Sequence, residues 1–162
     1  MVIDAKYVWN LLEQVYDPEV PVLTIVDLGV VREVVEKEQG WKIVITPTYS
    51  GCPAMKRIED DIIECLTENG VEHVEVALVL SPAWTTDWLS ENGRRKLKEY
   101  GIAPPVNEVD KGVLFAEPTV VPCPRCDSQN TKMISQFGST ACKAHYKCND
   151  CLEPFDYFKC LK

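Results

Sequence analysis

The stretch VVREVVEKEQGWKIVITPTYSGCP, residues 30–53, decides the fold of the first part of the chain. Residues 30–38 and 41–48 are rich in β-branched side chains, which favour strands. Gln39-Gly40 between them predicts a tight hairpin turn, because glycine tolerates the positive φ that such turns need. We therefore expect two antiparallel strands here, followed by the loop that contains Cys52.

Helical patterns on either side of this hairpin complete a small domain. Asp4 is placed to cap a first helix, and Pro53 suits the first position of a second helix, where a missing N–H costs nothing. Residues 71–80 predict a third strand, and a last helix is expected over residues 85–100. The order is α-β-β-α-β-α, with a three-stranded sheet.

The predicted fold is thus α/β, of the α+β type, followed by a β-rich zinc ribbon. We expect a first domain over residues 1–103 and a proline-containing linker over 104–122. Residues 123–162 are the expected ribbon. With 162 residues and 46% apolar residues, the chain has enough material for two small folded modules.

Composition also limits the class of partner. No stretch approaches the roughly 20 apolar residues that span a bilayer, and the start lacks a signal-peptide pattern, so we expect a cytoplasmic protein and no membrane partner. Residues 1–117 hold 21 acidic and 11 basic residues, whereas residues 118–162 hold 4 acidic and 6 basic ones. An acidic body argues against nucleic acid as the main partner.

Two Cys-x-x-Cys pairs near the C-terminus predict a metal site. Cys123, Cys126, Cys148 and Cys151 supply four thiolates, the ligand set of a tetrahedral structural zinc site. About forty residues cannot bury enough apolar surface to fold alone, so bound zinc would supply the missing stability. An iron cluster held by these cysteines is the alternative.

Two further thiols lie in the same region, Cys142 and Cys160. They are either packed as small apolar side chains or form a second thiol pair. One of them could also replace one of the four expected ligands.

Cys52 is the second candidate site. At the start of a helix, the dipole and the free N–H groups favour the thiolate, which binds metals or attacks electrophiles. The alternative is a buried structural cysteine. Asp27 lies beside a break in structure, where it either caps a turn or acts as an oxygen ligand that orients the Cys52 loop.

Three motifs in order resemble the iron–sulfur assembly family that includes bacterial SufT. They are Asp17-Pro18-Glu19-Val20-Pro21, residues 25–30 (IVDLGV) and residues 46–53 (TPTYSGCP). The resemblance implies a small α/β domain with a reactive cysteine, and Cys52 falls at that position. Asp27 and Thr48 also lie within the motifs and are weaker candidates for the same site.

The C-terminal part of the sequence points to one particular family. Residues 137–144 (FGSTACKA), 146–148 (YKC) and 151–160 (CLEPFDYFKC) resemble the PaaD family, which are subunits of the phenylacetyl-CoA epoxidase system. The resemblance implies an accessory subunit in aerobic phenylacetate catabolism, with the oxygenase or reductase subunits as partners. The chain contains no Glu-x-x-His pair for a di-iron centre and no dinucleotide glycine fingerprint, so we do not expect it to be catalytic alone.

The working hypothesis is maturation: Cys52 would transiently hold iron, an iron–sulfur cluster or sulfur, with Asp27 and Thr48 shaping its loop. The rivals are a non-catalytic structural or regulatory subunit of the oxygenase complex, and an electron carrier whose C-terminal cysteines hold an iron–sulfur cluster. Residues 137–144 and 153–158 are either a partner-docking surface or part of the packing inside the ribbon.

Overall fold

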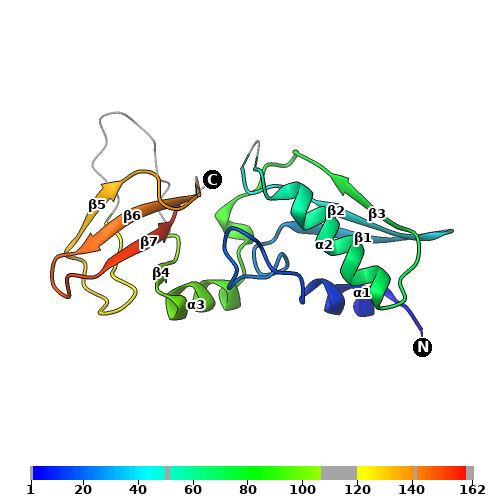
Figure 1. The fold of residues 1–162 in the computed structure, drawn as a ribbon, viewed down its shortest axis with the longest axis horizontal. Coiled ribbons are helices and arrows are strands. Elements are labelled where there is room, and N and C mark those ends of the chain that lie inside the picture. The colour runs from blue at the N-terminus through cyan, green and yellow to red at the C-terminus, as the bar shows by residue number, and fades with distance from the viewer. Residues whose placement is uncertain (1, 50–51, 107–119, 141, 160–162) are drawn as a thin grey trace. The chain divides into compact units, whose positions relative to one another are not determined.

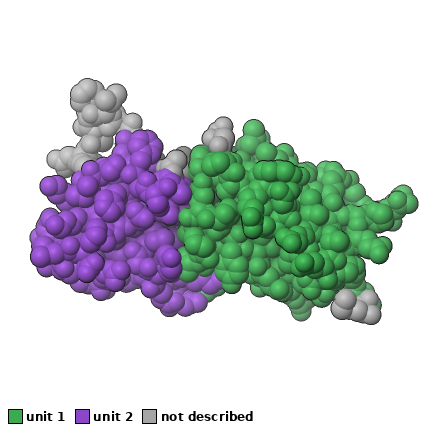
Figure 2. All heavy atoms as spheres, in the orientation of Figure 1, with its two compact units in different colours: residues 1–84, 88–93 green, residues 85–87, 94–162 purple. Residues whose placement is uncertain are grey.

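The computed structural model describes residues 2–49, 52–106, 120–140 and 142–159 (Figure 1). The chain forms two compact units, shown in Figure 2. Unit 1 comprises residues 1–84 and 88–93, and unit 2 comprises residues 85–87 and 94–162.

Unit 1 is built on a three-stranded sheet in the order β1-β2-β3. The hairpin of β1 (Val31–Lys37) and β2 (Gly40–Ile45) is antiparallel, as predicted. After β2 the chain passes through the Cys52 loop and α2 (Met55–Glu68), and returns as β3 (Val74–Leu78), which pairs with β2 in parallel. A parallel return of this kind needs a crossover, and α2 provides it.

The core of unit 1 lies between the sheet and two helices, α1 (Ala5–Leu12) and α2 (Figure 1). The Asp4 side chain accepts a hydrogen bond of 2.8 Å from the Tyr7 N–H and so caps α1, as expected. Strand β2 alternates buried and half-buried residues, and α2 buries one residue per turn. The buried side chains of these two elements are Trp41, Ile43, Ile45, Ile58, Ile62 and Leu66.

The expected helix over residues 85–100 is instead two elements, a 3₁₀ turn (Thr86–Trp88) and α3 (Glu91–Tyr100). Ser90 separates them, because its N–H donates to the Asp27 carbonyl (2.8 Å) and its hydroxyl accepts from the Gly93 N–H (2.9 Å). These bonds start a new helix at this point.

Unit 2 contains a four-stranded sheet in the order β4-β7-β6-β5. Antiparallel pairing joins β5 (Thr131–Ser135), β6 (Lys143–Cys148) and β7 (Pro154–Phe158), which confirms the β-rich ribbon. Strand β4 (Ile102–Ala103) pairs in parallel with β7, so the last two residues of the predicted first domain join the ribbon sheet. The limits of 103 and 122 stay a prediction, since residues 107–119 lie outside the described part of the chain.

Aromatic rings form the core of the ribbon. The Tyr146 ring stacks on Phe155 with 5.8 Å between centroids and meets Tyr157 edge-on at 5.5 Å. Phe155, Tyr157 and Phe158 are buried, so residues 153–158 serve mainly in packing. Phe137 is 63% exposed, with the Lys159 ammonium 4.7 Å from its ring centroid, and remains a surface residue.

Across the described residues, none of the helices has the length and apolar character needed to cross a membrane.

Candidate functional site: a four-cysteine centre and the Cys52 loop

The four cysteines of the two Cys-x-x-Cys pairs meet at one point in unit 2. All four sulfurs lie within 4.8 Å of one another. The Cys123 sulfur is 3.7 Å from that of Cys151, and the Cys126 sulfur is 3.6 Å from that of Cys148. One residue of each pair is buried, Cys123 and Cys148, and its partner is exposed.

Tight turns aim backbone N–H groups at two of these sulfurs. The Arg125 N–H donates to the Cys123 sulfur (3.4 Å), and the Cys151 N–H donates to the Cys148 sulfur (3.5 Å). The Cys151 N–H is the main cause that lowers the pKa of Cys148, to about 7. Backbone donors therefore stabilise the thiolate, which is the form that binds metals.

Asp150 ties the two turns together. Its carboxylate accepts hydrogen bonds from the Ser128 hydroxyl and from the Asn130 side chain (3.1 Å). Both bonds lower the pKa of Asp150, and the bond from Ser128 has the larger effect. The Asn149 N–H also donates to the Asn130 carbonyl (2.8 Å), so the two turns are hydrogen-bonded to each other.

The arrangement fits a single tetrahedral metal ion. Four sulfurs at about 2.3 Å from one ion lie roughly 3.8 Å from each other, close to the two short sulfur–sulfur distances. An iron–sulfur cluster spreads its cysteine ligands over several iron atoms and needs a wider set of sulfurs. The geometry of the four cysteines thus suits one metal ion better than a cluster.

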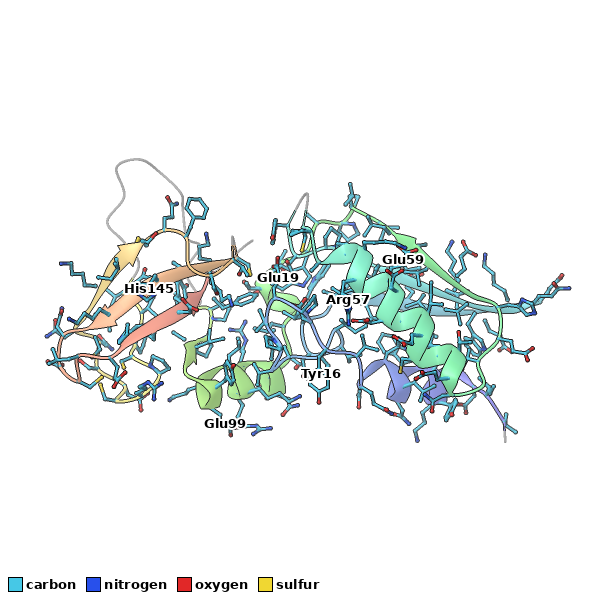
Figure 3. The ribbon with its side chains drawn as sticks, in the orientation of Figure 1. Tyr16, Glu19, Arg57, Glu59, Glu99 and His145 are labelled. Carbon is cyan, nitrogen blue, oxygen red and sulfur yellow. The ribbon has the colours of Figure 1, made fainter. Side chains whose placement is uncertain are left out.

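The other thiols of the C-terminal region differ in position. Cys142 is buried, and its sulfur lies 3.0 Å from the Thr140 hydroxyl, which fits the packed, small-residue alternative. Cys160 lies outside the described residues. His145, labelled in Figure 3, faces Asp156 with 3.6 Å between its Nδ1 atom and the carboxylate.

In unit 1, Cys52 lies in a turn ahead of α2. Helix α2 begins at Met55 with Ala54 as its N-cap, so Pro53 precedes the helix and does not occupy its first position. The Cys52 N–H donates to the Tyr49 carbonyl (3.3 Å), and the Cys52 carbonyl accepts from the Met55 N–H (3.5 Å). The side chain is half-buried and free of any disulfide.

The electrostatics at Cys52 differ from the sequence-based expectation of a favoured thiolate. Burial raises the pKa of Cys52, and the Ala54 N–H, which lowers it, does not compensate. The negative charges of Glu19 and Asp17 raise the pKa of Cys52 further. Burial and the two carboxylates raise the pKa of Cys52 by more than the backbone N–H group lowers it, so the resting form is the thiol.

Asp27 is a buried side chain held by its neighbours. Its N–H donates to the Thr24 hydroxyl (3.0 Å), and its carboxylate accepts from the Thr24 N–H (3.3 Å) and the Ser90 hydroxyl (3.2 Å). This reciprocal pattern matches the capping alternative. Thr48 is half-buried in the loop that leads to Cys52, and within the described residues its side chain forms no hydrogen bond.

Tyr49 and Glu19 were not predicted as site residues, although both lie in the motifs that resemble the assembly family. The Tyr49 hydroxyl donates to the Glu19 carboxylate, at 3.2 and 3.5 Å from its two oxygens, and the Tyr49 carbonyl accepts from the Cys52 N–H. Figure 3 shows Glu19 in the loop that follows α1. The available signal was the Asp17-Pro18-Glu19 motif, but sequence separation hid its proximity to Cys52.

Comparison with known proteins decides the family. The chain is 54% identical over 154 residues to an Escherichia coli K12 protein named as a subunit of 1,2-phenylacetyl-CoA epoxidase, and the match covers 95% of this chain and 92% of that one. The chain belongs to the PaaD family. The PaaD zinc beta ribbon domain matches residues 107–159, and the iron-sulfur cluster assembly protein model matches residues 6–78.

Relatives outside the PaaD family match the first module. The Bacillus subtilis protein named Fe-S protein maturation auxiliary factor YitW is 40% identical over 85 residues, covering 51% of this chain and 82% of that protein. A Bacillus anthracis structure titled as a DUF59 domain shares 33% identity at a TM-score of 0.54, covering 57% of this chain and 89% of that one. This chain thus joins a DUF59-like fold to a cysteine-rich ribbon.

Proposed function

We propose that this PaaD-family chain is an accessory subunit of a phenylacetyl-CoA epoxidase system, and that it aids insertion of metal or an iron–sulfur cluster during aerobic phenylacetate catabolism. The observation that carries the proposal is the pairing of two modules in one chain. One resembles maturation factors over residues 6–78, and the other is the ribbon of the PaaD family. The chain itself is not catalytic.

In this proposal, Cys52 is the residue that transiently holds the transferred iron, iron–sulfur cluster or sulfur, which we call the cargo. It is half-buried, in a loop, and the negative charges of Glu19 and Asp17 act on its sulfur. A cysteine that served only as an apolar packing residue would have no need of such polar neighbours. Thr48 lies in the same loop, and Asp27 stabilises the backbone of unit 1, so both act on the loop and not on the cargo.

The ribbon ion is zinc in this proposal, and its role is structural. All four ligands come from the protein, which leaves no open coordination position for a substrate. Bound zinc supplies folding energy to a sheet whose aromatic core is small. The cysteines bind the ion, and Asp150 holds the two turns at the right separation.

The partners are the oxygenase or reductase subunits, and the compartment is the cytoplasm. A four-thiolate site and a free Cys52 both need a reducing environment. The acidic character of residues 1–117 fits a protein partner better than nucleic acid.

Epoxidase activity in cells that make a substituted chain tests the function. We expect activity to fall to a small fraction with Cys52→Ala and to stay near the wild-type level with Cys65→Ala. Cys65 is the matched control, because it is also half-buried in unit 1 and its sulfur hydrogen-bonds to the Leu11 carbonyl (3.5 Å). Equal activity of the two variants would contradict the proposal.

A structural or regulatory subunit is the second candidate, and the raised pKa of Cys52 favours it. This role predicts stable co-purification with the oxygenase and tolerance of Cys52→Ser. An electron carrier predicts colour in anaerobically purified protein, whereas a zinc protein is colourless. The close approach of the four sulfurs argues against that third role.

A further inference from the structure

Strand β3 lies at one edge of the sheet in unit 1. The order β1-β2-β3 gives β3 a single partner, β2, and Figure 1 shows the other side of β3 facing away from the sheet. Among the described residues, no strand pairs with that outer side. An uncovered strand edge offers a row of backbone N–H and C=O groups to another chain.

The hydrogen bonds to β2 show which residues of β3 turn their backbone outward. The Val79 N–H donates to the Ile45 carbonyl (2.9 Å), and the His73 carbonyl accepts from the Trp41 N–H (3.1 Å). Backbone groups alternate in direction along a strand, so every second residue of β3 points away from β2. These outward residues are Val74, Val76 and Leu78.

The same three residues have apolar side chains that are only partly covered. Leu78 is 54% exposed, and Val74 and Val76 are half-buried. Strand β3 contains no proline and pairs with β2 without a bulge, so it lacks two devices that protect strand edges. Its one charged side chain, Glu75, is held at 3.0 Å by the Lys37 ammonium. The edge is therefore open to an additional strand.

A second copy of β3 fits this edge in an antiparallel register centred on Val76. In that register Val76 faces itself and Val74 faces Leu78, so outward residues meet outward residues and both backbone hydrogen bonds of each pair can form. All five residues of β3 are paired, and Glu75 lies across from Ala77. A register that sets Glu75 against a second Glu75 would oppose like charges, which is unfavourable.

We propose that β3 is a homodimerisation edge: two copies of the chain pair antiparallel through Val74–Leu78 and join two three-stranded sheets into one. A twofold axis at Val76 relates the copies, as in most homodimers. Five-residue strands bury less surface than the roughly 1,200 Å² of a stable interface, so the dimer is weak and depends on concentration. The proposal is independent of the role of Cys52.

Charge sets the salt dependence of this dimer. Residues 1–117 contain 21 acidic and 11 basic residues, so two copies repel each other. Salt screens this repulsion, while the paired edge itself is apolar apart from Glu75. The dimer should therefore become stronger as the ionic strength rises.

Sedimentation equilibrium of the full-length chain tests the dimer, over a range of protein concentrations and at low and high salt. A reducing buffer prevents disulfides between the free cysteines. We expect a monomer–dimer equilibrium that salt shifts toward the dimer. A chain that stays monomeric at the highest concentration, or a dimer that salt weakens, overturns the proposal.

Charges placed on the twofold axis test the register. Val76→Lys and Val76→Glu each oppose like charges, so each variant alone should be monomeric. An equimolar mixture sets a lysine against a glutamate and should dimerise again, which a variant that merely failed to fold could not do. A dimer in either variant alone, or no dimer on mixing, overturns the proposed pairing.

Val35→Lys is the matched control on the opposite edge of the sheet. Val35 is a 39% exposed valine of β1, and its substitution adds the same charge as Val76→Lys. This variant should dimerise at least as strongly as the wild-type chain. Loss of the dimer in both lysine variants would contradict a contact confined to β3.

Hydrogen exchange followed by NMR locates the contact. Dimerisation should slow exchange of the Val74, Val76 and Leu78 N–H groups, which have no partner strand in the monomer. Exchange at Glu75 and Ala77, whose backbone faces β2, should change little. A dimer without this alternating protection would place the interface elsewhere and overturn the proposal.

Discussion

At the scale of single residues, Cys52 shows why a local pattern can give the right position and the wrong electrostatics. The Gly-Cys-Pro sequence predicts a sulfur at a helix start, and the structure places it three residues before α2. The charges that raise the pKa of Cys52 belong to Asp17 and Glu19, more than thirty residues away. Sequence spacing carries no information about that approach, which depends on how the loop after α1 folds back.

For Asp27, the local sequence predicts the nearby hydrogen bonds correctly but not the distant one. A carboxylate beside a break in structure predicts capping, and the reciprocal bonds with Thr24 are local enough to be expected. Its bond to Ser90 spans 63 residues and could not be expected. This contact also explains why the helix predicted over residues 85–100 is divided.

Glycine strain provides a prediction at the same scale. Gly40 and Gly70 both have positive φ, +99° and +84°, but only at Gly40 would an added Cβ overlap the carbonyl of His73. Alanine in such a conformation costs roughly 1–2 kcal/mol. We expect Gly70→Ala to lose about 1 kcal/mol of unfolding free energy and Gly40→Ala to lose clearly more, about 3 kcal/mol, since backbone atoms cannot give way.

Urea unfolding monitored by tryptophan fluorescence measures both losses. Trp41 follows Gly40 and is buried in the hairpin, so it reports on that turn directly. Equal losses for the two alanine variants would show that φ strain alone matters and that the contact with His73 does not.

At the scale of elements, strands and their order are the most predictable part of the chain. Their β-branched side chains and the turn at residues 39–40 indicated β1 and β2, and the spacing of Ile58, Ile62 and Leu66 indicated α2. The two-residue strand β4 has no pattern to detect, because its pairing with β7 depends on a partner about fifty residues away. The four ribbon cysteines were predictable because their ligand spacing is local within each turn.

Metal removal tests the dependence of the ribbon on its ion. A structural zinc site contributes on the order of 10–16 kcal/mol of apparent binding energy, more than a four-stranded sheet of this size can supply. A strong chelator should therefore abolish amide hydrogen-exchange protection in β6 and β7. Protection that survives chelation would show that the aromatic cluster around Tyr146 suffices.

Unit 1 supplies the control for that experiment. All four tryptophans, Trp9, Trp41, Trp84 and Trp88, belong to unit 1. Their fluorescence should stay constant while the ribbon loses protection. A simultaneous change of tryptophan emission would mean that the fold of unit 1 depends on the metal as well.

At the scale of the whole molecule, the chain combines a module with a half-buried thiol and a module in which the sulfurs of four cysteines meet. The sequence contains neither a Glu-x-x-His pair nor a dinucleotide glycine fingerprint. The family match over 95% of the chain supports reading the two modules as one functional protein.

The iron content of the oxygenase subunit, purified anaerobically from cells that make the Cys52→Ala chain, tests delivery through Cys52 most directly. We predict iron well below the level obtained with the wild-type or Cys65→Ala chain, while the four-cysteine site of the variant keeps its own metal. An oxygenase fully loaded with iron in the absence of the Cys52 sulfur would contradict a delivery role for this protein.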